Sequence, residues 1–307
     1  MMIKPNRLKH GDTVGIIAPA SSPDDKYIQQ AVIYLEGLGL KVKYGKHLDK
    51  KQGYLAGGDL ERLEDLHSSF ADKEIKGIIC ARGGYGTSRI AHQIDYDLIK
   101  RNPKIFLGYS DITYLHTAIR QKCNLITFHG PMVASDMGRK EWDVLSDYYF
   151  QQFFRSDDII YNETISRLKA PISGIAEGPV VGGNLTLLIA SLGTPYEIDL
   201  HGKLLFIEEV HEEPRMIDRM LNQLLSSGKL EHINGLIIGD FKGCEARDEA
   251  SSFSLQEVLQ YYIHLINKPT LTGLKIGHCS PNITIPLGTN GEINTEKRFL
   301  RIECGTV

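Results

Sequence analysis

The sequence IKGIICARGGYGT, residues 75–87, indicates the fold most directly. Its first half, Ile75–Cys80, is an apolar run with the length of a buried β-strand. Its second half, residues 81–87, holds three glycines, which is typical of a tight turn between a strand and a helix. A strand that is apolar along most of its length, and not only at alternate positions, favours a parallel sheet covered by helices on both faces.

The same alternation of strand and helix continues on both sides of this stretch. Apolar, β-branched runs bounded by turn residues predict further strands, and apolar residues at helical spacing predict helices between them. The expected strands are 13–19, 41–44 and 105–107, and the expected helices are 27–38, 60–70 and 112–121. Strands separated by helices predict an α/β fold with a parallel sheet.

The pattern changes near the middle of the chain, where an aromatic-rich helix expected at 142–154 leads into the polar stretch RSDD at 155–158. The chain has 307 residues, about twice the ~150 residues typical of one domain. We therefore expect a first domain at 1–155, a linker at 156–170 and a smaller, more strand-rich α/β domain at 171–307. In this second domain we expect strands at 204–207 and 235–239, helices at 216–225 and 255–266, and several short strands after these.

The composition excludes several classes of protein. The chain carries 35 Lys and Arg against 38 Asp and Glu, so it lacks the basic excess with which proteins bind nucleic acid or anionic membranes. No apolar run approaches the ~18 residues that span a membrane. The N-terminal segment also lacks the apolar stretch and cleavage site of a secretory signal. We expect a cytoplasmic protein that binds neither nucleic acid nor membrane.

The cysteines indicate neither a disulfide framework nor a zinc site. They are odd in number and form no C-x-x-C pair, so free thiols are expected. The segment HEEPR at 211–215 is not an H-E-x-x-H zinc helix, because Arg215 stands in place of the second histidine. The five cysteines are Cys80, Cys123, Cys244, Cys279 and Cys304.

Polar residues follow several of the expected strands, and ligands of open parallel sheets bind beyond the carboxyl ends of the strands. The glycine-rich turn at 81–87 could bind a phosphate or an oxyanion through its backbone N–H groups, or form a tight turn without a ligand. It lacks the G-x-G-x-x-G spacing and the lysine of common phosphate loops. In GYSD at 108–111, Ser110 occupies the position of a nucleophile elbow without its second glycine, or of a helix N-cap.

Acidic residues and a histidine follow strands in the second domain. Glu208 and Glu209 come directly after the apolar run 204–207. A carboxylate there could orient a histidine, remain solvated, or pair with Arg215 or Arg219. His278 follows a glycine at another expected strand end, where it could act as a general base or have a structural role.

A serine, an acid and a histidine at strand ends, beside a glycine-rich turn, are the groups that acyl transfer requires. The same residues also fit a binding module without turnover, in which the serine only caps a helix. A third interpretation is a nucleotide-dependent enzyme that uses the turn at 81–87, although the sequence has no Walker-type lysine.

The chain resembles, over nearly its whole length, the LD-carboxypeptidases of serine peptidase family S66, which also includes the microcin-C self-immunity peptidases. The segments that carry this resemblance occur in the family's order. They are GIIAPAS at 15–21, ARGGYG at 81–86, GYSD at 108–111, HGPM at 129–132, GGNL at 182–185, FIEE at 206–209 with IDRM at 217–220, and GH at 277–278.

The resemblance implies roles for particular residues. Ser110 corresponds to the nucleophile, His278 to the general base and Glu208 to the acid of the triad. The family's usual Leu-Glu-Asp is Ile-Glu-Glu in this chain, and the match falls on Glu208, not Glu209. The N–H groups of Asp111 and of Gly83 or Gly84 would bind the oxyanion, and we take Gly84 as the candidate. No metal or organic cofactor is needed.

The resemblance further implies a homodimer with a flavodoxin-like N-terminal domain that removes the terminal D-alanine from murein tetrapeptides in peptidoglycan recycling. Candidates for substrate binding are Arg82, Gly83 and Asn184. The family's other branch cleaves a toxic aminoacyl-nucleotide conjugate, and residues 213–220 are more similar to the murein branch. A non-catalytic murein-peptide binding protein is the remaining alternative.

Overall fold

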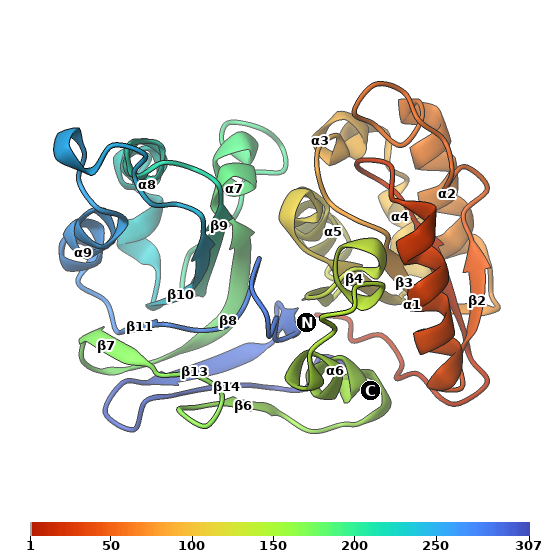
Figure 1. Ribbon diagram of the computed structural model, residues 1–307. Coiled ribbons are helices and arrows are strands. Elements are labelled where there is room, and N and C mark those ends of the chain that lie inside the picture. Colours follow the sequence, from red (N-terminus) through yellow and green to blue (C-terminus); the bar gives the residue numbers. More distant parts are fainter. Residues whose placement is uncertain (1) are drawn as a thin grey trace. The chain divides into compact units, whose positions relative to one another are not determined.

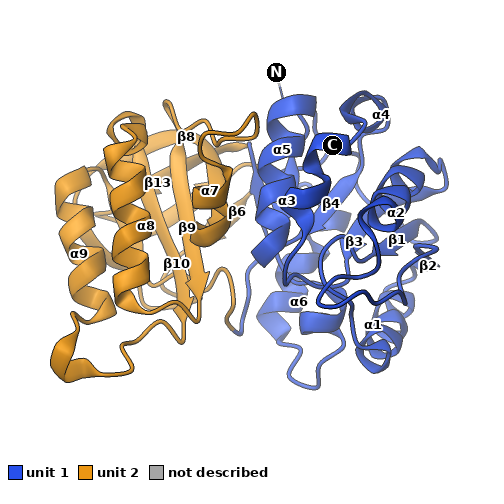
Figure 2. Ribbon diagram, turned by 90° about the horizontal axis from the view of Figure 1, so that it is seen from above, with its two compact units in different colours: residues 1–157, 280–288, 304–307 blue, residues 158–279, 289–303 orange. Residues whose placement is uncertain are grey.

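The computed structural model describes residues 2–307 and divides into two compact units, coloured separately in Figure 2. The first unit contains the chain up to Asp157 together with Ser280–Gly288 and Cys304–Val307. The second unit contains Asp158–Cys279 and Thr289–Glu303. The chain therefore returns to the first unit twice after leaving it.

The first unit, within the described residues, is built on a six-stranded sheet in the order β12-β5-β4-β3-β1-β2. The sheet is parallel except that β12 pairs antiparallel with β5. The order β2-β1-β3-β4-β5 is that of the flavodoxin-like doubly wound fold, as predicted. The strands are β1 (Thr13–Ile17), β2 (Lys41–Tyr44), β3 (Ile75–Cys80), β4 (Ile105–Gly108), β5 (Thr127–His129) and β12 (Ile285–Leu287).

Helices cover both faces of this sheet (Figure 1). Side chains of α1 (Asp25–Gly37) and α6 (Val144–Phe150) share one core with Ile79 and Leu107 of the strands. Side chains of α2 (Asp59–Ala71), α4 (Tyr96–Arg101) and α5 (Thr113–Cys123) share another core with Ile78 and Phe106. Neighbouring strand residues thus enter opposite cores, which is why these strands are apolar almost throughout.

The second unit is the smaller α/β unit and, as predicted, the richer in strands. Its eight-stranded sheet, within residues 2–307, has the order β6-β14-β13-β8-β9-β10-β11-β7 and is parallel from β8 to β11. Its strands are β6 (Ile159–Tyr161), β7 (Lys169–Ile172), β8 (Ile175–Asn184), β9 (Leu204–Val210), β10 (Gly235–Lys242), β11 (Thr270–Thr272), β13 (Asn290–Asn294) and β14 (Phe299–Ile302).

Three helices of the second unit, α7 (Leu185–Ser191), α8 (Pro214–Ser226) and α9 (Leu255–Ile266), contribute to one apolar core with β9 and β10. Helix α8 contributes Ile217, Leu221 and Leu224, which follow the i, i+4, i+7 spacing of an amphipathic helix. No helix in the part of the chain that the structure describes is both long and apolar enough to span a membrane.

Some elements differ from the sequence expectations. The expected helix at 142–154 is α6 followed by a 3₁₀ turn, Gln151–Phe154. Strand β8, which lies at the centre of the second sheet, is not apparent from the sequence because glycines lower its β-propensity. One of them is required by packing, since a Cβ on Gly182 would lie 1.8 Å from the carbonyl oxygen of Phe206 on the neighbouring strand.

Candidate active site

Ser110 lies on a sharp turn that follows the carboxyl end of β4. Its φ is 63°, a left-handed conformation that non-glycine residues rarely adopt. It is the first residue of the short helical segment Ser110–Ile112, whose N-cap is Tyr109, and the N-cap of the following helix α5 is Ile112, so Ser110 caps neither. The geometry is therefore that of an elbow between a strand and a helix, and not that of a serine N-cap.

The buried side chain of His116 hydrogen-bonds to the backbone just before this turn. The carbonyl oxygen of Gly108 accepts hydrogen bonds from the backbone N–H of Gly130 at 3.2 Å and from Nε2 of His116 at 2.8 Å. Burial lowers the pKa of His116 to about 4, so the ring is neutral at pH 7 with its proton on Nε2. The end of β4 is thus fixed two residues before Ser110.

The glycine-rich turn packs directly against Ser110. A Cβ built on Gly83 would lie 2.8 Å from Cβ and 2.9 Å from Oγ of Ser110, and 3.4 Å from the backbone nitrogen of Asp111. The next glycine, Gly84, has a φ of 113°, which strongly favours glycine. The two segments that the sequence singled out separately, 81–87 and 108–111, therefore form one structure.

Two buried polar groups hold the glycine-rich turn in place. The Asp111 carboxylate accepts from the N–H of Thr87 at 2.9 Å, and the Thr87 hydroxyl donates to the Asp111 carbonyl at 2.7 Å. The buried guanidinium of Arg62 donates to the carbonyl oxygens of Pro19 at 2.6 Å and Gly86 at 2.9 Å. Burial raises the pKa of Asp111 to about 6, against the opposing effects of its hydrogen bonds from Thr87.

Backbone donors beside Ser110 are available. In the described part of the chain the N–H of Gly84 donates to no protein acceptor. The N–H of Asp111 belongs to the first turn of a helical segment, where N–H groups have no acceptor within the helix. The exposed Arg82 donates from its guanidinium to the carbonyl of Ser22 at 3.2 Å. The surroundings of Ser110 can therefore stabilise negative charge.

Glu208 and His278 form a buried pair in the second unit. Glu208 follows the four apolar residues of β9 and is fully buried. Its Oε2 lies 2.7 Å from Nδ1 of His278. A carboxylate only accepts, so Nδ1 carries the proton of this hydrogen bond and the acceptor nitrogen of the neutral ring is Nε2. Gly277 permits this approach, because a Cβ there would lie 2.7 Å from the same carboxylate oxygen.

The adjacent Glu209 has different partners. Its carboxylate accepts from Nδ2 of Asn184 at 2.9 Å and from the N–H and hydroxyl of Thr186, each at 2.8 Å. Burial raises its pKa, which these donors oppose. Arg215, offered as an ion-pair partner for the glutamates, pairs with Glu213 at 3.0 Å. The carboxylate that contacts the histidine is thus that of Glu208.

Asn184 is buried, and its side chain connects two structural features. Its oxygen caps α7 by accepting from the N–H of Leu187 at 3.3 Å, while its nitrogen donates to Glu209. A contact between Asn184 and substrate remains a prediction. The structure therefore assembles two groups of candidates: Gly83, Gly84 and Asp111 around Ser110 in the first unit, and Glu208 with His278 in the second.

Three residues that support the turns around Ser110 were not predicted to do so from the sequence, namely Arg62, Thr87 and His116. Arg62 left a signal, since it lies one helical turn before the buried Leu66 on α2. A charged residue on the apolar face of a helix is unusual and requires buried partners. His116 lies within the almost completely buried α5, but nothing in the local sequence identifies its acceptor.

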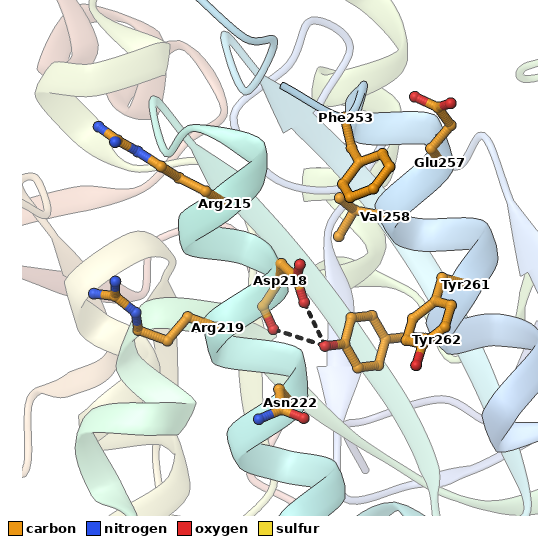
Figure 3. Close-up of a pocket in the computed structure, with 9 residues that line it drawn as sticks. All are labelled: Arg215, Asp218, Arg219, Asn222, Phe253, Glu257, Val258, Tyr261 and Tyr262. Carbon is orange, nitrogen blue, oxygen red and sulfur yellow. Dashed lines mark hydrogen bonds between the residues drawn. The ribbon is translucent and has the colours of Figure 1, made fainter. Parts of the chain in front are cut away.

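Other possible binding features lie elsewhere. A cavity of about 650 Å³ lies between α8 and α9 of the second unit and is shown in Figure 3. Tyr262 and Asp218 meet there, the tyrosine hydroxyl donating to the aspartate. None of the candidate catalytic, oxyanion-binding or substrate-binding residues lines this cavity, although Arg215 and Arg219 do. Residues 2–307 contain no cluster of three or more His, Cys, Asp or Glu side chains arranged to hold a metal ion.

Family models and known proteins match this chain over most of its length. The family model of the LD-carboxypeptidase N-terminal domain matches residues 14–130, and that of the C-terminal domain matches residues 177–293. A Bacillus subtilis protein named probable murein peptide carboxypeptidase is 52% identical over 302 residues, covering 98% of this chain and 95% of that protein. The Pseudomonas aeruginosa murein tetrapeptide carboxypeptidase is 31% identical, covering 90% and 91%.

Solved structures show the same fold. The structure of MccF in complex with glutamyl sulfamoyl guanosine has a TM-score of 0.89 at 26% identity and covers 98% of each chain. The muramoyltetrapeptide carboxypeptidase from Oxalobacter formigenes has a TM-score of 0.85 at 29% identity, covering 94% of this chain and 97% of that one. The fold and the family matches define a peptidase-class hydrolase. The chain belongs to the LD-carboxypeptidase family, peptidase family S66.

Proposed function

We propose that this protein is a serine-type LD-carboxypeptidase that releases the terminal D-alanine from murein tetrapeptides. The observation that carries the proposal is the 52% identity, across nearly the full length of both chains, to the B. subtilis protein named probable murein peptide carboxypeptidase. The Ser110 elbow and the Glu208–His278 pair support it, because they supply the groups that acyl transfer requires.

In the proposed reaction Nε2 of His278 accepts the proton of Ser110 as Oγ attacks the carbonyl carbon of the L,D-peptide bond. Glu208 holds the proton of His278 on Nδ1 and stabilises the imidazolium that forms. His278 then donates the proton to the leaving nitrogen. D-Alanine is released, and the rest of the peptide remains bound to Ser110 as an acyl-enzyme ester. Water, deprotonated by His278, hydrolyses this ester and restores the serine.

The negative charge that develops on the carbonyl oxygen requires donors that are already in place. The N–H groups of Gly84 and Asp111 fill this role in the proposal. An exopeptidase must also recognise the terminal carboxylate of its substrate, for which a guanidinium is well suited. Arg82 is the proposed cation, since it is exposed on the glycine-rich turn and one hydrogen bond to Ser22 leaves other donors of its guanidinium available.

The alternative substrate is an aminoacyl-nucleotide conjugate. It is favoured by the structural similarity to MccF, whose structures include complexes with glutamyl sulfamoyl guanosine and aspartyl sulfamoyl adenosine. The two substrates differ at the carbonyl that is attacked. In the murein peptide this carbonyl precedes a D-amino acid with a free carboxylate, whereas in the conjugate it precedes a nucleoside-linked group.

The test is release of D-alanine from L-Ala-γ-D-Glu-meso-diaminopimelate-D-Ala by the purified protein and by Ser110→Ala. The proposal expects release by the parent and a loss on the order of 10⁶-fold in kcat for the variant. The same peptide ending in L-alanine is the stereochemical control and should not be cleaved. Aspartyl sulfamoyl adenosine, with free aspartate as the readout, tests the alternative.

The results distinguish the murein carboxypeptidase from the two alternative functions. No release of D-alanine together with release of aspartate supports the conjugate as substrate. No release from either compound supports a murein-peptide binding protein. Equal release by the parent and by Ser110→Ala rules out Ser110 as the nucleophile. We further propose that the protein acts as a cytoplasmic homodimer, and sedimentation equilibrium of the purified protein tests the dimer.

A further inference from the structure

Ser21, which follows β1, contacts the glycine-rich turn at two successive peptide units. Its backbone N–H donates to the carbonyl oxygen of Gly83 at 3.3 Å. Its hydroxyl oxygen accepts from the N–H of Tyr85 at 3.2 Å. The side chain also packs against Gly84, where a Cβ would lie 2.3 Å from Oγ of Ser21.

These contacts fix which way the backbone N–H groups of the turn point. The peptide unit between Gly83 and Gly84 is planar and trans, so its C=O and N–H point in opposite directions. Because the Gly83 carbonyl is directed to Ser21, the Gly84 N–H is directed away from Ser21. The following N–H, that of Tyr85, is directed to Ser21 and is thereby occupied.

Because Ser21 occupies the N–H of Tyr85, the N–H of Gly84 is the donor of this pair that remains available. In the described chain the Gly84 N–H has no protein acceptor, and Gly83 lies against both Ser110 and the nitrogen of Asp111. Glycines at positions 83 and 84 give this segment unusual freedom to rotate its peptide units. Without a restraint, rotation of the Gly83–Gly84 unit would turn its N–H away from the direction it has in this structure.

We propose that Ser21 is a positioning residue of the oxyanion site, whose hydroxyl, by holding the Tyr85 N–H, keeps the preceding Gly84 N–H in the orientation that stabilises the transition state. The backbone N–H of Ser21, which side-chain variants retain, holds the Gly83 carbonyl. This inference rests on the proposed function and concerns the same site. Ser21 does not touch the reacting atoms, so its effect is transmitted through the backbone of residues 83–85. Arg62 fixes the far end of the same turn at Gly86.

The experiment measures kcat and KM for D-alanine release by Ser21→Ala, which removes the acceptor of the Tyr85 N–H. Loss of one oxyanion donor typically lowers kcat by about 10²–10³-fold, so partial misorientation should lower kcat by roughly 10–100-fold. KM should change less than twofold, because the donor acts in the transition state. Ser21→Thr retains the hydroxyl and should recover most of the loss.

Ser22→Ala is the matched control. Ser22 is the adjacent residue, and its hydroxyl donates to the carbonyls of Lys50 at 2.7 Å and Leu55 at 3.1 Å, outside the glycine-rich turn. The control removes hydrogen bonds from the same loop, keeps the Ser22 backbone carbonyl that accepts from Arg82, and should leave kcat unchanged. If Ser21→Ala does not fold, Ser21→Cys replaces it, because a thiol is close in size and a weak acceptor.

The outcomes separate this inference from the proposed function. No D-alanine release by the parent protein contradicts the proposed function itself. An active parent with an unchanged kcat in Ser21→Ala or Ser21→Cys overturns the role of Ser21. Equal losses in the Ser21 and Ser22 variants, or a change confined to KM, also overturn it, since either would indicate a general effect of the loop.

Discussion

Nδ1 of His278 lies 2.7 Å from Oε2 of Glu208, whose side chain is fully buried, whereas the next residue, Glu209, accepts from Asn184 and Thr186. The two adjacent glutamates therefore have different structural roles. One contacts the histidine, and the other joins β9 to the start of α7.

Replacing each glutamate by glutamine separates these roles. Glu208→Gln should lower kcat by about 10⁴-fold, because the amide can donate to Nδ1 and stabilise the wrong tautomer of His278. Its free energy of unfolding should change less than that of Glu209→Gln, because an amide can still hydrogen-bond to Nδ1 of His278. Glu209→Gln should instead lose about 1–3 kcal/mol of stability, because its amide nitrogen faces donors. Steady-state kinetics and urea denaturation of both variants provide the measurements. A loss of stability in Glu208→Gln together with a loss of kcat in Glu209→Gln would contradict these roles.

The left-handed backbone of Ser110 predicts an unusual order of stability. A non-glycine residue in this conformation costs about 1–2 kcal/mol, so Ser110→Gly should be about 1 kcal/mol more stable than Ser110→Ala. Ser68, exposed on α2, is the control site. There glycine should be less stable than alanine by about 1 kcal/mol, as in other helix interiors. Thermal unfolding of the four variants tests the prediction, and the same order at both sites would show that the turn is unstrained.

Gly83 predicts a steric effect on the nucleophile. In Gly83→Ala the new methyl group would lie 2.8 Å from Cβ and 2.9 Å from Oγ of Ser110, so either the serine or the turn must move. A misplacement of about 1 Å can lower the rate by about 10²-fold, and we expect at least this loss in kcat/KM. Gly37→Ala, where the structure has no heavy atom within 4 Å of the new methyl group, should retain full activity. Wild-type activity in Gly83→Ala would mean that the turn is not closely packed on Ser110.

Asp111 predicts a pH dependence of stability. Burial raises its pKa to about 6 in the folded protein, above the value of 3.8 for an unperturbed aspartate, so the folded state binds the proton more tightly than the unfolded state. The contribution of this group to stability is present at acidic pH and is lost as the pH rises through about 6. Between pH 5 and 7 the loss amounts to about 1.4 kcal/mol.

Asp111→Asn removes this titration. Relative to the wild type, the variant should gain about 1.4 kcal/mol in free energy of unfolding between pH 5 and pH 7. Urea denaturation at the two pH values measures the difference. Asp157→Asn, which alters an exposed residue, is the control and should run parallel to the wild type. A parallel pH dependence of Asp111→Asn and the wild type would contradict the raised pKa.

Local sequence was sufficient to predict much of the first sheet. The residues of β3 coincide with the expected strand at 75–80, because a strand buried on both faces is apolar almost throughout and ends at turn residues. Strand β2 also coincides with the expected strand at 41–44, although it is a partly exposed edge strand. The same reasoning located the glycine-rich turn and the serine that follows β4, since both directly follow strands buried on both faces. Neither prediction depended on contacts between distant parts of the chain.

The sequence alone thus determined the α/β class and the segments that carry the chemistry, and its resemblance to family S66 implied the flavodoxin-like sheet. Only the tertiary structure decided that β12, from residues 285–287, completes the first sheet, that Glu208 and not Glu209 contacts His278, and that Ser21 and Arg62 hold the glycine-rich turn. The physical reason is that periodicity reports the burial of one element at a time. Which segment pairs with the edge of a sheet depends on contacts between parts of the chain that are far apart in sequence. The same holds for the partners of a buried carboxylate or guanidinium.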